Sequence, residues 1–125
     1  MNYADYGYIR LAAVAPLVAL GNPKRNAERI LLAMQQNEYA DVSLMLFPEL
    51  CVSGYTCEDL FFNQSMINQC EEALHQIARA TDERIVVVGA PWRLSDGRML
   101  NAGFVCQNGL IIGACLLYTS PSPRD

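Results

Sequence analysis

The stretch that decides the fold lies at residues 42–50 and reads Val42-Ser43-Leu44-Met45-Leu46-Phe47-Pro48-Glu49-Leu50. Residues 42–47 form an apolar run with Ser43 as its one polar residue, which is typical of a strand covered on both faces of a parallel sheet. The run ends at Pro48-Glu49. The sequence therefore predicts a buried strand with a carboxylate directly after its C-terminal end.

Strands and helices are predicted to alternate around this run. Apolar patterns predict strands at residues 9–15 and 85–88, the second closed by Gly89-Ala90-Pro91. One helix is expected to start at Asn22-Pro23, with Asn22 as N-cap, and another to run roughly from Gln64 to Ala80. Their predicted apolar faces are Ala27, Ile30, Leu31 and Met34 in the first helix and Met66, Ile67, Cys70, Ala73, Leu74 and Ile77 in the second. The order β-α-β-α-β predicts an α/β fold with parallel strands.

The second half of the chain has a different pattern. Ser95-Asp96-Gly97 predicts a turn between strands at residues 92–94 and 99–105. Asn108-Gly109 is a strong hairpin signal, and residues 110–117 are expected to form the returning strand. An antiparallel meander is therefore predicted after the parallel part.

Residues 118–125 match nothing before them, because they contain two prolines and show neither a helical nor a strand period. We expect residues 1–117 to form the domain and residues 118–125 to be an unstructured tail with few contacts. The tail is either a flexible natural C-terminus or a non-native sequence, and its composition favours the second alternative.

Composition narrows the class of protein. A chain of 125 residues with a formal net charge of −4 is one acidic domain, which argues against a nucleic-acid surface. The apolar stretch at residues 11–20 is too short for a membrane span and is interrupted by Pro16. The five cysteines contain no CxxC pair and there is one histidine, which predicts no metal site and reduced thiols in the cytoplasm. Three of these thiols lie in apolar patterns and are expected to act as small buried hydrophobes: Cys70, Cys106 and Cys115.

Glu49 is the first candidate for a reactive group. A carboxylate directly after an apolar strand is partly desolvated, which raises its pKa toward the range of a general base. A solvated or salt-bridged loop glutamate is the alternative that position alone leaves open. Cys51 and Cys57 show no basic or helix-N-terminal environment and are not expected to be nucleophiles. His75 is expected to be a partly exposed residue in the middle of a helix.

Several motifs in series resemble a known family. Leu46-Phe47-Pro48-Glu49-Leu50, followed by Ser53-Gly54-Tyr55, resembles the first motif of the nitrilase-type carbon–nitrogen hydrolases. The continuation Glu58-Asp59-Leu60 is similar to the glutaminase domains of glutamine-dependent NAD synthetases. The resemblance covers residues 3–116 in unbroken order and continues through Val88-Gly89-Ala90-Pro91, Asn101-Ala102 and Gly109 to Gly113.

The resemblance implies an α-β-β-α sandwich of which this chain is the N-terminal part. In this family a Glu-Lys-Cys triad hydrolyses the side-chain amide of glutamine. The released ammonia passes to a synthetase domain that uses ATP and Mg²⁺ to make NAD from nicotinic acid adenine dinucleotide. Glu49 matches the general base, and Tyr55 matches a residue that lines the glutamine pocket. No cofactor is implied for this domain itself, and the intact proteins are expected to be homo-oligomers.

The chain also departs from the family pattern. The family's Lys is expected near position 117, where Leu117 stands, and the catalytic Cys and the synthetase domain belong to segments that this chain lacks. We therefore expect the chain alone to be inactive and poorly soluble, with apolar sheet surface left uncovered. The alternatives are another nitrilase-type amidase that acts on a small amide and a non-catalytic α/β interaction module.

Overall fold

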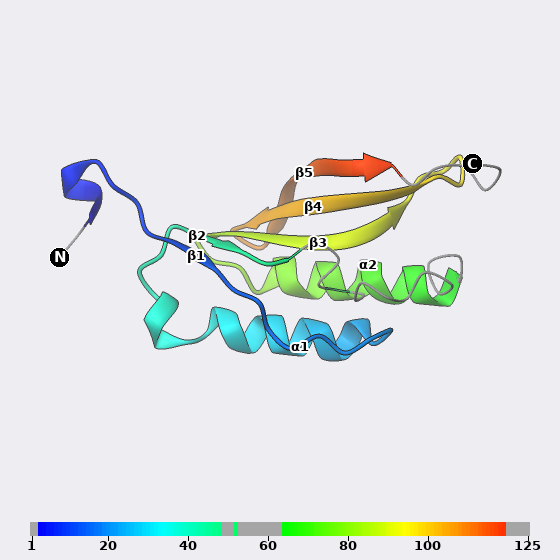
Figure 1. Ribbon diagram of the computed structural model, residues 1–125, viewed down its shortest axis with the longest axis horizontal. Helices are drawn as coiled ribbons and strands as arrows, with labels where there is room; N and C mark the ends of the chain where they lie inside the picture. The colour runs from blue at the N-terminus through cyan, green and yellow to red at the C-terminus, as the bar shows by residue number, and fades with distance from the viewer. Residues whose placement is uncertain (1–2, 49–51, 53–63, 120–125) are drawn as a thin grey trace.

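The computed structural model describes residues 3–48, 52 and 64–119 (Figure 1). The 3-10 turn η1 (Tyr3–Tyr6) precedes β1 (Leu11–Ala13), α1 (Pro23–Met34), the 3-10 turn η2 (Asn37–Tyr39) and β2 (Leu44–Leu46). After them come α2 (Gln64–Arg79), β3 (Ile85–Arg93), β4 (Met99–Gln107) and β5 (Leu110–Thr119). The predicted order of strands and helices is confirmed.

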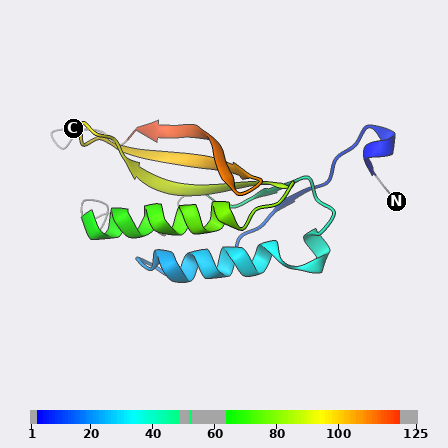
Figure 2. The same ribbon diagram turned by 180° about the vertical axis from the view of Figure 1, so that it is seen from behind.

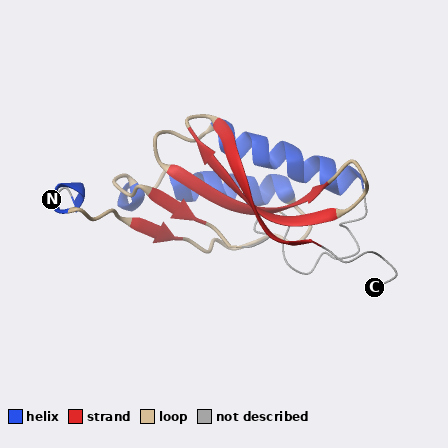
Figure 3. Cartoon of the chain, turned by 90° about the horizontal axis from the view of Figure 1, so that it is seen from above, coloured by secondary structure: helices blue, strands red, loops and turns tan. Residues whose placement is uncertain are grey.

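The described strands form one mixed sheet in the order β1-β2-β3-β4-β5 (Figure 3). β1, β2 and β3 are parallel, and β3, β4 and β5 form an antiparallel meander. Both the parallel part and the meander therefore agree with the sequence prediction. The α/β class is confirmed.

Both helices lie on the same face of the sheet (Figures 1 and 2). This follows from the topology, because right-handed crossovers between strands that are added in one direction place their helices on one side. The predicted start of α1 is confirmed, since the side chain of Asn22 accepts a hydrogen bond of 3.1 Å from the backbone N–H of Arg25. This bond satisfies one of the backbone donors that a helix start leaves open.

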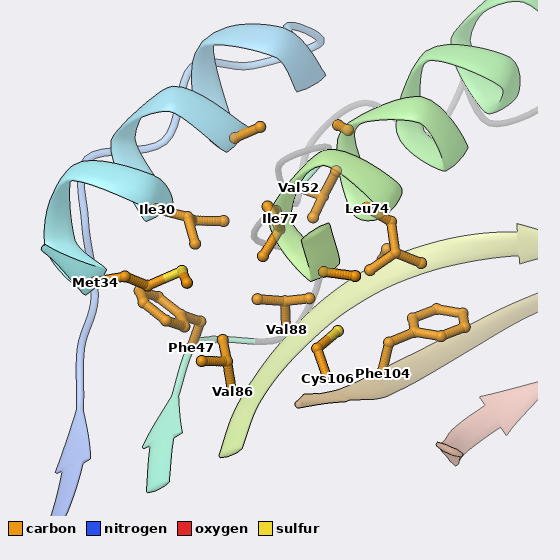
Figure 4. Packing of buried hydrophobic residues seen from close by; sticks show 14 of the residues in the cluster. Ile30, Met34, Phe47, Val52, Leu74, Ile77, Val86, Val88, Phe104 and Cys106 are labelled. Atoms are coloured by element: carbon orange, nitrogen blue, oxygen red, sulfur yellow. The ribbon is translucent and has the colours of Figure 1, made fainter. Parts of the chain in front are cut away.

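The hydrophobic core lies between the helices and this face of the sheet. The predicted apolar face of α2 is buried throughout, and that of α1 is buried except for the half-buried Leu31. Figure 4 shows how Ile30 and Ile77 point from the helices toward Val88 in the sheet. The side chains that face the helices alternate along each strand with side chains that face away.

β3 is longer than predicted, because it continues through Gly89-Ala90-Pro91 to Arg93 as one strand. The predicted break at Pro91 is wrong. The carbonyl oxygens of Val87 and Gly89 accept hydrogen bonds from the N–H groups of Phe47 and Val52. The backbone polar groups of alternate β3 residues therefore point toward β2. Pro91 faces the same side at a point where β2 has already ended, and its missing N–H removes no ladder bond.

β5 also extends beyond its predicted end. Tyr118 pairs with Asn101 and Thr119 with Leu100, so the expectation that the tail is unstructured from residue 118 is wrong for these two residues. Backbone pairing can continue to Thr119 because the first proline of the tail stands at position 121. Residues 120–125 lie outside the described residues. The predicted hairpin at Asn108-Gly109 is confirmed, with φ of 53° and 82° as a tight primed turn requires.

The face of the sheet turned away from the helices is apolar and uncovered by any described residue. Leu11 is 61% exposed and Leu46 is 47% exposed, although both lie within strands. The prediction that the chain leaves apolar sheet surface open is therefore confirmed for the described part of the chain. Within that part, neither helix is long and apolar enough to cross a membrane.

Candidate active site at the carboxyl edge of the sheet

The C-terminal ends of β1 and β2 lie side by side, because Ala13 pairs with Leu46. The N–H of Val14 donates to the carbonyl oxygen of Leu46 at 2.9 Å, and the N–H of Phe47 donates to that of Val87 at 2.9 Å. Parallel pairing thus persists one residue beyond each strand. Loops that leave this edge carry the functional sites of α/β proteins, since they fan out above the ends of the strands.

The two predicted site residues, Glu49 and Tyr55, lie outside the described residues, as do Cys51 and Cys57. Their roles stay predictions. The residues on either side of Glu49 are described at Pro48 and Val52. Pro48 is half-buried and Val52 is fully buried.

A hollow of about 570 Å³ opens at this edge, on the face of the sheet that the helices do not cover. All five strands or the residues that follow them contribute to it. The lining residues are Ala13, Val14, Ala15, Leu46, Phe47, Pro48, Val87, Gly89, Gly103 and Cys115. The volume of the hollow is in the range of small-molecule sites.

The described lining of the hollow is almost wholly apolar, and Cys115 carries the single titratable side chain among the described residues that line it. Apolar walls withhold water from a carboxylate, and a poorly solvated carboxylate is a stronger base. The described ion pairs, such as Arg10 with Asp41 and Arg84 with Asp82, lie outside this lining. Within the described ranges, no three or more His, Cys, Asp or Glu side chains gather into a group that could hold a metal ion.

The described cysteines fall into two classes. Cys70 and Cys106 are buried among the core residues, as predicted, and burial raises the pKa of the Cys106 thiol to about 11. The prediction is wrong for Cys115, which is exposed. Cys115 pairs with Gly103, whose place in the hollow puts both residues on the uncovered face. His75 is exposed in the middle of α2, as predicted.

Sequence reasoning missed one residue near this edge, Asn26. Its side chain is buried and contacts the segments that follow both β1 and β2. A signal was present, because Asn26 is a polar residue on the helix face that also carries Pro23, Ala27 and Ile30. A polar side chain in such a stripe requires a hydrogen-bond partner in the interior.

The model of the family described as "Carbon-nitrogen hydrolase" matches residues 10–114. Among similar curated proteins, the glutamine-dependent NAD(+) synthetase of Mycobacterium leprae is 28% identical over 99% of this chain and 18% of its own length. That of Mycobacterium bovis is 31% identical over 97% of this chain and 18% of its own length. The chain therefore spans less than a fifth of these relatives.

Solved structures give the same picture of the fold. A crystal structure of a glutamine-dependent NAD(+) synthetase from Cytophaga hutchinsonii superposes with a TM-score of 0.79 at 30% identity, over 86% of this chain and 18% of that chain. An amidase of the nitrilase superfamily from Nesterenkonia AN1 superposes with a TM-score of 0.70 at 19% identity, over 93% of this chain and 46% of that chain. The fold is thus nitrilase-like, and the described part of this chain contains one helical layer and one sheet of it.

Proposed function

The chain belongs to the carbon–nitrogen hydrolase family, and we propose that it forms the N-terminal part of a glutaminase domain that supplies ammonia for NAD synthesis. The observation that carries this proposal is the match of almost the whole chain to proteins named glutamine-dependent NAD(+) synthetase. Because the chain spans so little of their length, synthetase activity, ATP and Mg²⁺, homo-oligomers and a cytoplasmic location are proposed for a longer protein only.

In this proposal Glu49 is the general base. It accepts the proton of a cysteine thiol, and the thiolate attacks the side-chain amide carbon of glutamine. The C–N bond breaks, the proton passes to the leaving nitrogen, and ammonia departs. Water then hydrolyses the thioester to glutamate and restores the thiol. We place this cysteine, and a lysine that stabilises the oxyanion, beyond residue 117 in the longer protein.

The geometry of the carboxyl edge supports this assignment. Pro48, which directly precedes Glu49 in the sequence, lines the hollow. The hollow offers apolar walls and no described carboxylate of its own, so an acidic group from the adjoining loop is the natural source of a base. Tyr55 is proposed to line the glutamine pocket, on the strength of its place in the motif.

A second candidate is another nitrilase-type amidase that acts on a small amide. The likeness to the Nesterenkonia amidase supports a shared fold alone, whereas the similarity to the synthetases extends to sequence. The synthetase assignment is therefore preferred. A non-catalytic module is the remaining alternative for the chain taken by itself.

The test begins with the source gene. The reading frame beyond residue 117 is sequenced and the longer protein is expressed. It is expected to make NAD from nicotinic acid adenine dinucleotide and ATP with either glutamine or ammonium as nitrogen donor. Glu49→Gln should lower the glutamine-driven rate on the order of a thousandfold and leave the ammonium-driven rate intact, because only the hydrolysis step needs the base.

Glu38→Gln is the matched control, since Glu38 is an exposed glutamate in η2. It should change neither rate. Full glutamine-driven activity in Glu49→Gln would remove Glu49 from the mechanism. A longer protein that hydrolyses a small amide but not glutamine would favour the amidase alternative.

A further inference from the structure

Asn26 is a buried amide in an apolar setting. It lies in α1 with 1% of its surface exposed, beside the buried residues Pro23, Ala27 and Ile30. Transfer of an amide from water into such a place is unfavourable unless its donors and acceptor are satisfied. The hydrogen-bond partners of Asn26 therefore indicate which backbone segments it holds in place.

The Asn26 side chain binds two separate segments of the chain. Its Oδ1 accepts a bond of 2.6 Å from the N–H of Ala19, and its Nδ2 donates to the carbonyl oxygen of Ala19 at 2.8 Å. The same Nδ2 donates to the carbonyl oxygen of Val52 at 2.8 Å, and this bond is buried. One side chain thus links the segment that follows β1 to the segment that follows β2.

Val52 is held from two sides. Its carbonyl oxygen accepts the Asn26 bond, and its N–H donates to the carbonyl oxygen of Gly89 in β3 at 3.2 Å. Its side chain is fully buried in the core. Val52, which follows residues 48–51 in the sequence, is therefore anchored by bonds at both its N–H and its carbonyl oxygen. Phe47, which precedes residues 48–51, is anchored by the bond from its N–H to the carbonyl oxygen of Val87.

We propose that Asn26 is a positioning residue for the base, because it anchors Val52, which stands three residues after Glu49 in the sequence. This inference rests on the proposed function of Glu49. Asn26 does not act on substrate. Its contribution is to hold Val52 in place, and precise placement of a catalytic group is a large part of catalytic rate.

Thr81 offers a matched control at the opposite edge of the sheet. It is also a buried polar residue, and its hydroxyl donates to the carbonyl oxygen of Ala78 at 2.7 Å and accepts from the N–H of Gly109 at 2.9 Å. Thr81→Val removes these bonds before the start of β3, away from the hollow. Thr81→Val should lower the free energy of unfolding about as much as Asn26→Ala does. It should not change amide hydrogen exchange at Val52.

The experiment compares the longer wild-type protein with Asn26→Ala, Asn26→Asp and Thr81→Val. Amide hydrogen exchange at Val52 and glutaminase kcat and KM are measured on each. Asn26→Ala should speed exchange at Val52 on the order of tenfold and lower kcat on the order of 10- to 100-fold, with KM within about twofold. Thr81→Val should change neither Val52 exchange nor kcat.

Asn26→Asp keeps an oxygen that accepts from the N–H of Ala19 but loses the donor to the carbonyl oxygens of Ala19 and Val52. In this variant the Ala19 amide should exchange as slowly as in the wild type, whereas the Val52 amide should exchange faster. The test therefore stays decisive if Asn26→Ala folds poorly. Unchanged Val52 exchange in a folded Asn26 variant overturns the proposal, and so does faster exchange with unchanged kcat. A wild-type protein that hydrolyses no glutamine overturns the proposed function instead, and Val52 exchange then decides the anchoring role by itself.

Discussion

Cys106→Ala should remove a loss of stability that the wild-type protein suffers at alkaline pH. Cys106 is fully buried in the core, and desolvation raises the pKa of its thiol from 9.0 to about 11. Below about pH 9 the thiol is protonated in both the folded and the unfolded chain, so the burial is fully favourable there. Between about pH 9 and pH 11 the unfolded chain ionises first, which lowers the free energy of unfolding.

The size of the effect follows from the displacement of the pKa. It corresponds to about 1–3 kcal/mol of stability lost between those two pH values. The assay is urea unfolding of the wild type and the variant under reducing conditions, from about pH 8 to about pH 11. The variant loses packing at every pH, but its stability difference from the wild type should shrink by the stated amount as pH rises. A difference that stays constant with pH would refute the reasoning, because the thiol would then titrate as it does in water.

Three further predictions concern the core, the hairpin and the isolated chain. Leu74→Ala should lower the free energy of unfolding by about 2–5 kcal/mol, because Leu74 is fully buried, whereas Leu32→Ala at a position 64% exposed should change it by less than about 0.5 kcal/mol in the same urea titration. Gly109→Ala should cost about 1–2 kcal/mol, since Gly109 has a φ of 82°, while Gly113→Ala, which meets no atom within 4 Å, should be nearly neutral; thermal melts of the two variants check this pair. The chain of 125 residues alone should release no ammonia from glutamine in a coupled glutamate dehydrogenase assay, and release that a thiol reagent blocks would mean that a cysteine of this chain is a nucleophile.

The helices and the order of strands could be predicted because their signals are local. The apolar face of α2 repeats with the helical period, and Asn22-Pro23 marks the start of α1 by its own chemistry. The turn at Asn108-Gly109 requires positive φ at both residues, which these two residue types adopt at low cost. In each case the residues that set the structure are neighbours in the chain.

The errors arose where a distant partner decides the outcome. Pro91 stays within β3 because β2 ends early, and no residue near Pro91 encodes where β2 ends. Cys115 is exposed because its side of the sheet is uncovered, although its own neighbours are as apolar as those of Cys106. The role of Asn26 depends on Ala19 and on Val52, and the second of these is 26 residues away. The roles of Glu49 and Tyr55 rest on motif resemblance, and they remain predictions.

The order of the strands in the sheet is the order in which a ribosome makes them. Each described strand after β1 pairs with the strand made just before it, so its partner has already been synthesised when it emerges. The turns of the antiparallel meander close small loops, which favours rapid pairing. The parallel pairs join distant residues, such as Leu11 with Leu44 and Leu44 with Ile85, and are expected to form more slowly. The sheet can therefore grow at one edge while synthesis proceeds, with each new strand added to a surface that is already in place.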